Sequence, residues 1–94
     1  MAFVQVTRGR GITKSQYDAV TRAAYGGKLA EGEIFRVAGP GKDAWYVIDG
    51  WVSRELCDRS GEKLMSAFQK TGIPMPSMAV EEFDIHQHLK AQGG

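Results

Sequence analysis

The chain has 94 residues, enough for one hydrophobic core and too few for two, so we expect a single domain over residues 1–94. Its 12 basic and 11 acidic side chains leave a formal charge of +1, which gives no electrostatic attraction for nucleic acid or an anionic membrane surface. The single cysteine, Cys57, forms no internal disulfide, and no apolar run is long enough for a secretion signal or a membrane span, so we expect a cytoplasmic protein.

The first half of the chain predicts strand, helix, strand and strand. Residues 3–8 alternate apolar and polar side chains and lead into a glycine-containing turn, which predicts a strand. Thr13 and Gln16 have the spacing of a capping box, which satisfies free backbone N–H groups, so we expect a helix from residue 14 to about residue 25, before Gly26. Residues 32–38 and 44–51 are strand-like and a turn-forming segment joins them, which predicts a hairpin.

The second half adds a helix and a strand. Ser53 stands at an N-cap position and apolar side chains recur at helical spacing after it, which predicts a helix over residues 54–71 that ends at Gly72. Pro74 and Pro76 prevent its continuation, and residues 79–88 alternate like a last strand. The order βαββαβ predicts an α+β, ferredoxin-like fold, a four-stranded antiparallel sheet with both helices on one face.

Strand parity divides this sheet into two faces. One set is uniformly apolar and is expected to lie under the helices: Val4, Val6, Phe35, Val37, Tyr46, Ile48, Phe83 and Ile85. The other set mixes large apolar and polar side chains and is expected to be left uncovered: Phe3, Gln5, Thr7, Ile34, Arg36, Ala38, Trp45, Val47, Asp49, Trp51, Glu82, Asp84, His86 and His88. Soluble monomers rarely expose so large an apolar patch, so we expect a homodimer in which a second copy covers this face and polar groups line a partly enclosed interior.

Three segments resemble a group of small uncharacterised bacterial proteins with the dimeric α+β barrel fold: residues 34–40 (IFRVAGP), 45–55 (WYVIDGWVSRE) and 83–86 (FDIH). The resemblance covers nearly the whole chain, and residues 45–55 are its most specific part. The superfamily includes antibiotic biosynthesis monooxygenases, which oxidise polycyclic aromatic substrates without metal or flavin, and also haem-degrading enzymes, isomerases and proteins without known activity. The haem degraders use an Asn, a Trp and a His, whereas this chain contains no Asn and has no His in its second predicted helix.

The resemblance implies two functions of different classes. One is a cofactor-independent, monooxygenase-like enzyme that acts on a small aromatic or polyketide-like substrate. The other is a non-catalytic dimeric protein that binds a ligand or has a structural role. Fold alone does not choose between them. The sequence leaves the substrate, the reaction and the pathway open.

His86 and Asp49 are the candidate catalytic residues. An imidazole in a half-enclosed barrel titrates near neutral pH and can move a proton to or from an aromatic substrate, although a hydrogen-bonded structural histidine is the commoner case at a strand end. A carboxylate at Asp49 must either be paired, with Arg36 on the neighbouring strand as the candidate, or be tuned for proton transfer.

Aromatic side chains on the mixed face are candidates for substrate binding. Trp45, Trp51 and Phe3 share that face and suit stacking on a flat substrate, with Arg36 beside them. Packing at a dimer interface is the alternative, and it is the favoured explanation for such large side chains.

A metal site near the end of the chain is the weakest candidate. Asp84, His86 and His88 alternate along the last predicted strand, and Asp49 or Glu82 would have to complete a ligand set. Any polar strand face has this spacing, so we expect neither a metal nor another cofactor.

Overall fold

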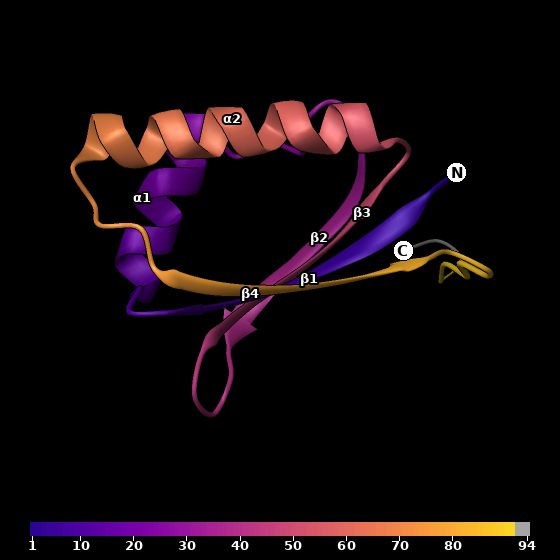
Figure 1. Cartoon of the computed structure of the whole chain (residues 1–94), viewed down its shortest axis with the longest axis horizontal. Helices are drawn as coiled ribbons and strands as arrows, with labels where there is room; N and C mark the ends of the chain where they lie inside the picture. The colour runs from indigo at the N-terminus through magenta and orange to yellow at the C-terminus, as the bar shows by residue number, and fades with distance from the viewer. Residues whose placement is uncertain (92–94) are drawn as a thin grey trace.

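The structure is a computed structural model that describes residues 1–91. Its elements follow in the order β1 (Phe3–Arg10), α1 (Lys14–Tyr25), β2 (Glu33–Pro40), β3 (Trp45–Trp51), α2 (Arg54–Thr71) and β4 (Ser77–Asp84). The four strands form one antiparallel sheet in the order β2-β3-β1-β4, and both helices lie on one side of it (Figure 1). The predicted ferredoxin-like fold is therefore confirmed.

Both helices begin and end where their capping residues predict. The Gln16 backbone N–H donates to the Thr13 hydroxyl at 3.2 Å, and the Gln16 side chain accepts from the Thr13 backbone N–H at 3.0 Å. Ser53 caps α2 by accepting from the Leu56 backbone N–H at 3.3 Å. Gly72 follows α2 with a φ of 71°, a left-handed conformation that glycine adopts without steric cost.

The helices cover the face that was predicted to be open, so the expected assignment of the two faces is wrong. Phe3 and Trp51, from the mixed set, form a buried cluster with Cys57 of α2. Val37 and Phe83, from the uniformly apolar set, lie on the helix-free face and are 61% and 57% exposed. The polar members of the mixed set are tolerated under the helices because they pair with one another or line a cavity.

A second buried cluster joins the two helices. Val20 of α1 packs with Ala67 and Phe68 of α2. The first cluster thus joins α2 to the sheet, the second joins the two helices to each other, and a cavity remains between the helices and the sheet. No helix within residues 1–91 is long and apolar enough to cross a membrane.

One irregularity in β2 changes which side chains meet. Glu33 is opposite Trp51, and Phe35 is opposite Gly50, the residue adjacent to Trp51 on β3. Ile34 therefore has no partner of its own and forms a β-bulge. A bulge inserts one extra residue and reverses the parity of everything beyond it. Glu33 therefore lies on the same, helix-covered side as Arg36.

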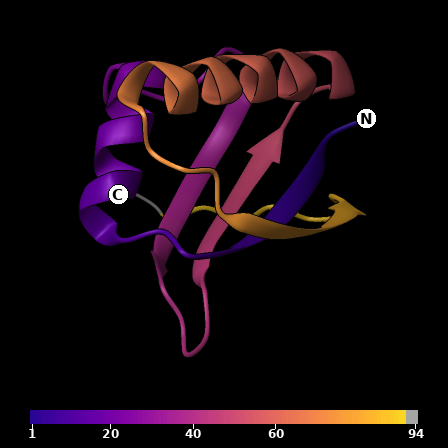
Figure 2. The same ribbon diagram turned by 60° about the vertical axis from the view of Figure 1, so that its left-hand side comes forward.

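The chain leaves the sheet earlier than predicted, because β4 ends at Asp84 and not at residue 88. Beyond it, the Ile85 backbone N–H donates to the Ala2 carbonyl at 2.9 Å. The His88 ring then packs on Phe35 of β2, the opposite edge strand, with ring centroids 5.4 Å apart. The segment after β4 thus crosses the helix-free face of the sheet (Figure 2, yellow).

Candidate functional site

A cavity of about 430 Å³ lies between the sheet and the two helices. All four strands and both helices contribute to its wall, which is mostly apolar. Cavities of this size and character bind small molecules, with a few polar groups fixing the ligand's orientation. This cavity is the candidate site.

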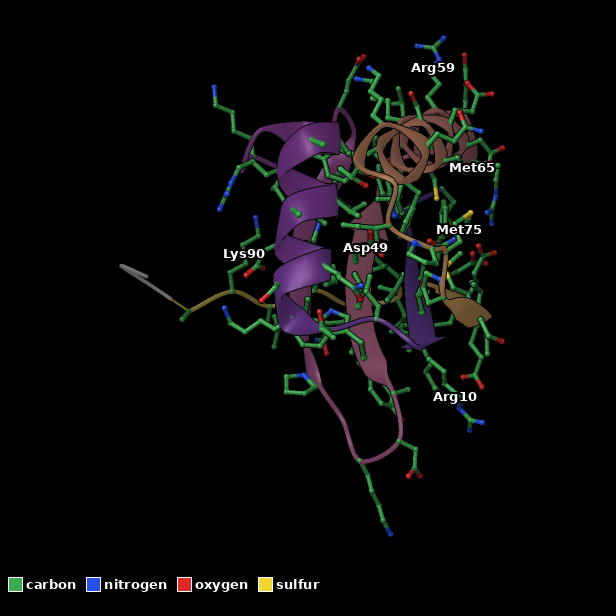
Figure 3. The ribbon with its side chains drawn as sticks, turned by 90° about the vertical axis from the view of Figure 1, so that its left-hand side faces the viewer. Arg10, Asp49, Arg59, Met65, Met75 and Lys90 are labelled. Carbon is green, nitrogen blue, oxygen red and sulfur yellow. The ribbon has the colours of Figure 1, made fainter. Side chains whose placement is uncertain are left out.

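The cavity opens to solvent between α2 and β4. Four apolar lining residues are exposed there: Met65 of α2, Met75 of the following loop, and Met78 and Val80 of β4. Figure 3 shows Met65 and Met75 on one side of the molecule, with Asp49 farther in, between α1 and the sheet. Methionine side chains are flexible and adapt to apolar ligands of different shape, so this opening suits the entry of an apolar molecule.

Two tryptophans on β3 present hydrogen-bond donors that the protein does not use. Nε1 of Trp45 and Nε1 of Trp51 are buried and have no partner among residues 1–91. Tyr17 of α1 packs on Trp45, with ring centroids 5.1 Å apart. A buried donor without a partner costs free energy, and a ligand oxygen that accepts from the indole would recover it.

Arg36 is held in a buried ion pair with Glu33. Its Nε donates to Glu33 Oε2 at 2.9 Å, and its Nη2 donates to Oε1 at 2.6 Å. The Glu33 side chain is fully buried, and it also accepts from the Ala30 backbone N–H at 2.9 Å. The guanidinium lies over the ring of Tyr25, 4.5 Å from its centroid. Arg36 is thus fixed by a two-pronged contact and a ring, which makes it a poor partner for any other carboxylate.

Asp49 is a buried acid of the site that has no ion-pair partner among residues 1–91. The residue is buried, and its Oδ1 has no hydrogen-bond partner in the described part of the chain. Burial and the neighbouring Glu33 carboxylate raise the pKa of Asp49 to about 7, although the charge of Arg36 acts against this rise. Near neutral pH this carboxyl group therefore gains and loses a proton.

Two tyrosines and the cysteine at the cavity wall stay neutral near pH 7. Burial raises the pKa of Tyr17 and of Tyr25, whose hydroxyl is 2.6 Å from the Ser60 hydroxyl. Burial, with Asp49 adding to it, raises the pKa of Cys57 to about 11, so this thiol is not a ready nucleophile. Asp49 is therefore the candidate proton acceptor of the cavity.

Four of the six candidate residues from the sequence come together. Asp49, Trp45, Trp51 and Arg36 all line the cavity. Phe3 does not, because it packs behind Trp51 in the cluster with Cys57, beneath the guanidinium of Arg54. These positions leave the roles of the four cavity residues as predictions.

His86 lies apart from this group. It is exposed in the segment that follows β4, and it forms no part of the cavity wall. Residues 1–91 contain no cluster of three or more His, Cys, Asp or Glu side chains that could hold a metal.

Sequence reasoning missed Glu33, Tyr17 and Tyr25 as members of the site. The positions of the two tyrosines in the predicted helix indicated only core packing, since an aromatic residue on the apolar face of a helix is normally a core residue. Glu33 gave none, because only the β-bulge places it beside Arg36.

The role of Trp51 in stability is testable by truncation. Trp51 is 2% exposed, so Trp51→Ala is expected to lower the free energy of unfolding by about 3–5 kcal/mol. Val52→Ala is the matched control, because Val52 is next to Trp51 in the chain and is 49% exposed. This variant should change the free energy of unfolding by less than about 0.5 kcal/mol. Urea denaturation measures both, and equal effects would show that Trp51 does not hold α2 to the sheet.

No protein-family model and no curated protein matches this chain in sequence. Solved structures do match it in fold. A candidate antibiotic biosynthesis monooxygenase from Chloroflexus aurantiacus J-10-fl superposes with a TM-score of 0.68 at 14% identity, over 96% of this chain and 98% of that chain. A point mutant of SnoaB, a cofactor-independent oxygenase from Streptomyces nogalater, gives 0.63 at 10% identity, over 96% and 97%.

A third solved structure matches the fold at similarly low sequence identity. A candidate antibiotic biosynthesis monooxygenase from Caulobacter crescentus CB15 gives a TM-score of 0.64 at 13% identity, over 92% of this chain and 91% of that chain. The chain therefore shares its fold with these antibiotic biosynthesis monooxygenase-like proteins. At such low identity the likeness establishes the fold and leaves the activity to be argued from the site.

Proposed function

We propose that this protein is a cofactor-independent, monooxygenase-like enzyme that acts on a small aromatic or polyketide-like substrate with a phenolic hydroxyl group. One observation carries the proposal: three buried polar groups without hydrogen-bond partners lie on the wall of the same apolar cavity. They are the Asp49 carboxyl group and the indole N–H groups of Trp45 and Trp51. A hydroxylated aromatic ketone supplies what these groups lack. Its hydroxyl donates to Asp49 and its carbonyl oxygen accepts from an indole.

In this proposal Asp49 is the general base. The substrate O–H bond breaks, the proton moves to Asp49, and the electron pair stays on the substrate oxygen as a phenolate. A base with a pKa near the working pH performs this transfer best, which fits the raised pKa of Asp49. The negative charge spreads through the ring to the conjugated carbonyl oxygen, and an indole N–H stabilises it there, because donors fixed in an apolar site need no reorganisation.

Dioxygen is the second substrate. The electron-rich phenolate ring is oxidised, and one oxygen atom of O2 becomes a second ring carbonyl. The other oxygen leaves as water, with the hydroxyl hydrogen and the hydrogen of the oxidised ring carbon. The net reaction converts a phenol and O2 into a quinone and water, and it needs no added reductant. SnoaB, which has the same fold, is itself described as a cofactor-independent oxygenase, which supports this reaction class.

We further propose that the protein works as a homodimer joined through the helix-free face of the sheet. Exposed apolar side chains on that face support this arrangement, with Val37, Tyr46 and Phe83 the largest of them. The cavity then stays on the far side of each sheet, with its opening between α2 and β4 free. His86 is not assigned a role in the proposed reaction, since it is remote from Asp49.

Oxygen uptake with a panel of hydroxylated naphthalenes and anthracenes tests the proposal. Trp45 and Trp51 are the only tryptophans, and both line the cavity, so quenching of their fluorescence reports binding directly. We expect quenching and stoichiometric oxygen consumption with at least one phenol. Quenching without oxygen uptake would favour the ligand-binding alternative, and the absence of both would overturn the proposed site.

A further inference from the structure

The sheet places two hydrogen-bond donors beside Asp49, one on each neighbouring strand. In the register of β3, Asp49 is opposite Arg36 on β2 and opposite Gln5 on β1. Side chains directly opposite one another in an antiparallel sheet are close enough to interact. A buried carboxylate in this position is therefore expected to take the guanidinium, the amide, or both.

Both donors are instead directed to other carboxylates. Arg36 donates twice to Glu33, at 2.9 and 2.6 Å. The Gln5 amide donates to Glu82 Oε2 at 3.0 Å. Each of these carboxylates, Glu33 and Glu82, thus withdraws one flanking donor, and Asp49 Oδ1 is left buried without a partner among the residues that the structure describes.

Each competing carboxylate is itself held in place. Glu33 reaches Arg36 because of the β-bulge, and the Ala30 backbone N–H fixes its Oε1. Glu82 is bound by both terminal nitrogens of Arg54, at 2.8 and 2.5 Å, which ties the start of α2 to β4. Two-pronged contacts between Arg and a carboxylate are directional. The contact of Glu33 is also buried and therefore strong, whereas Glu82 is partly exposed and holds its donor more weakly.

The buried side chains that the helices pack over Asp49 are neutral, and the charged residues of α2 that line the cavity, Asp58 and Glu62, are exposed to solvent. Tyr17 and Tyr25 of α1 and Cys57 of α2 are neutral near pH 7, since burial raises the pKa of each. The Trp51 indole lies beside Asp49 on β3. The protonation of Asp49 therefore depends on whether Glu33 and Glu82 keep the two flanking donors.

We propose that Glu33 and Glu82 are positioning residues that keep Asp49 available as a proton acceptor by engaging Arg36 and Gln5. The catalytic meaning of this inference rests on the proposed function, but the arrangement itself does not. If Arg36 bonded to Asp49, that carboxylate would be stabilised as an anion and would accept a proton weakly. Glu33 and Asp49 thus compete for the Arg36 guanidinium. The carboxylate that does not bind Arg36 is the better proton acceptor.

Glu33→Gln tests this directly. Loss of the Glu33 charge frees Arg36 to turn to its cross-strand partner, and a carboxylate next to Asp49 disappears at the same time. We expect the pKa of Asp49 to fall by about one unit or more. The readout is the carboxyl 13C signal of Asp49 as a function of pH, assigned with Asp49→Asn, which needs no ligand and no turnover.

Glu82→Gln is the second variant, because its side chain lies near the surface and is 32% exposed. It releases Gln5 and should lower the pKa of Asp49 by a smaller amount. Glu55→Gln is the matched control, since Glu55 forms an exposed ion pair with Arg59 at 2.7 Å on α2 and should leave the signal unchanged. An Asp49 titration that is the same in the parent and in both test variants would overturn the inference.

The kinetic readout separates this inference from the proposed function. With an active phenol, kcat/KM should rise with pH through the pKa of Asp49, and Glu33→Gln should move that rise to lower pH with a lower plateau. A shifted NMR titration without any turnover would keep the positioning role and reject the enzyme. Turnover with an unshifted titration would keep the enzyme and reject the positioning role.

Discussion

Asp49→Asn is expected to reduce turnover of a phenolic substrate by about 100-fold to 10,000-fold, the usual loss when a general base is removed. The amide has the shape of the carboxyl group but does not accept a proton at neutral pH. Binding should change far less, because the cavity walls and the indole donors remain. Oxygen uptake at saturating phenol measures the loss, and tryptophan fluorescence measures the binding.

The same substitution is expected to stabilise the protein, and the gain should depend on pH. The pKa of Asp49 is raised in the folded state from 3.8 to about 7, so between these values the folded chain holds a proton that the unfolded chain has lost. Stability of the parent therefore falls as pH rises through that window, whereas Asn has nothing to titrate. We expect Asp49→Asn to be more stable by about 1–3 kcal/mol above pH 7 and by much less at pH 4.

Asp43→Asn is the matched control for both measurements. Asp43 lies exposed in the loop between β2 and β3, away from the cavity. It should leave turnover and stability unchanged at both pH values. A similar gain for Asp49→Asn at pH 4 and pH 8 would show that Asp49 titrates normally, and full turnover by that variant would remove it as the base.

The local parts of the fold could be predicted because their signals are local. Thr13, Gln16, Ser53 and Gly72 act on backbone groups within four residues of themselves, so both helices have the predicted bounds. The ends of strands are harder to predict from sequence, because pairing with a neighbouring strand determines where a strand stops. The last strand shows this, because β4 has partners only as far as Asp84.

Which face the helices cover could not be decided from strand parity. Parity separated the side chains correctly within the strands, whereas His86 and His88 lie beyond the end of β4 and do not follow it. It also assumes that the more apolar set is always the one inside. That assumption fails when the helices enclose a cavity and the apolar set serves another purpose. The polar residues under the helices, Arg36 and Asp49 among them, are there to line a site, and the exposed Val37 and Phe83 need another partner.

The sequence predicted two alternatives for Asp49, an ion pair with Arg36 or a carboxyl group whose pKa suits proton transfer. Its neighbour Arg36 was identified correctly as the nearest cation across the sheet, and the register confirms that they are opposite. The sequence could not show that a third residue, Glu33, takes Arg36 away. One extra residue in β2 determines that outcome, and no sequence pattern marks the bulge.

The helix-free face is expected to be the dimer interface, and a charge placed there should dissociate the dimer. Val37→Asp puts a carboxylate on the proposed contact surface, opposite Ile48 in the register of β2 and β3. An unpaired charge buried at an interface is costly, so we expect dimer affinity to fall by about 100-fold or more. Sedimentation equilibrium or light scattering at micromolar concentration measures the change.

Val80→Asp is a control with the same chemistry on the other side of the sheet. Val80 is 51% exposed, close to the 61% of Val37, but it lines the opening of the cavity on β4. The variant should therefore remain a dimer. Loss of the dimer in Val80→Asp but not in Val37→Asp would reverse the interface. A parent protein that is monomeric and stably folded at these concentrations would remove it, because Val37, Tyr46 and Phe83 would then be exposed to solvent without a partner.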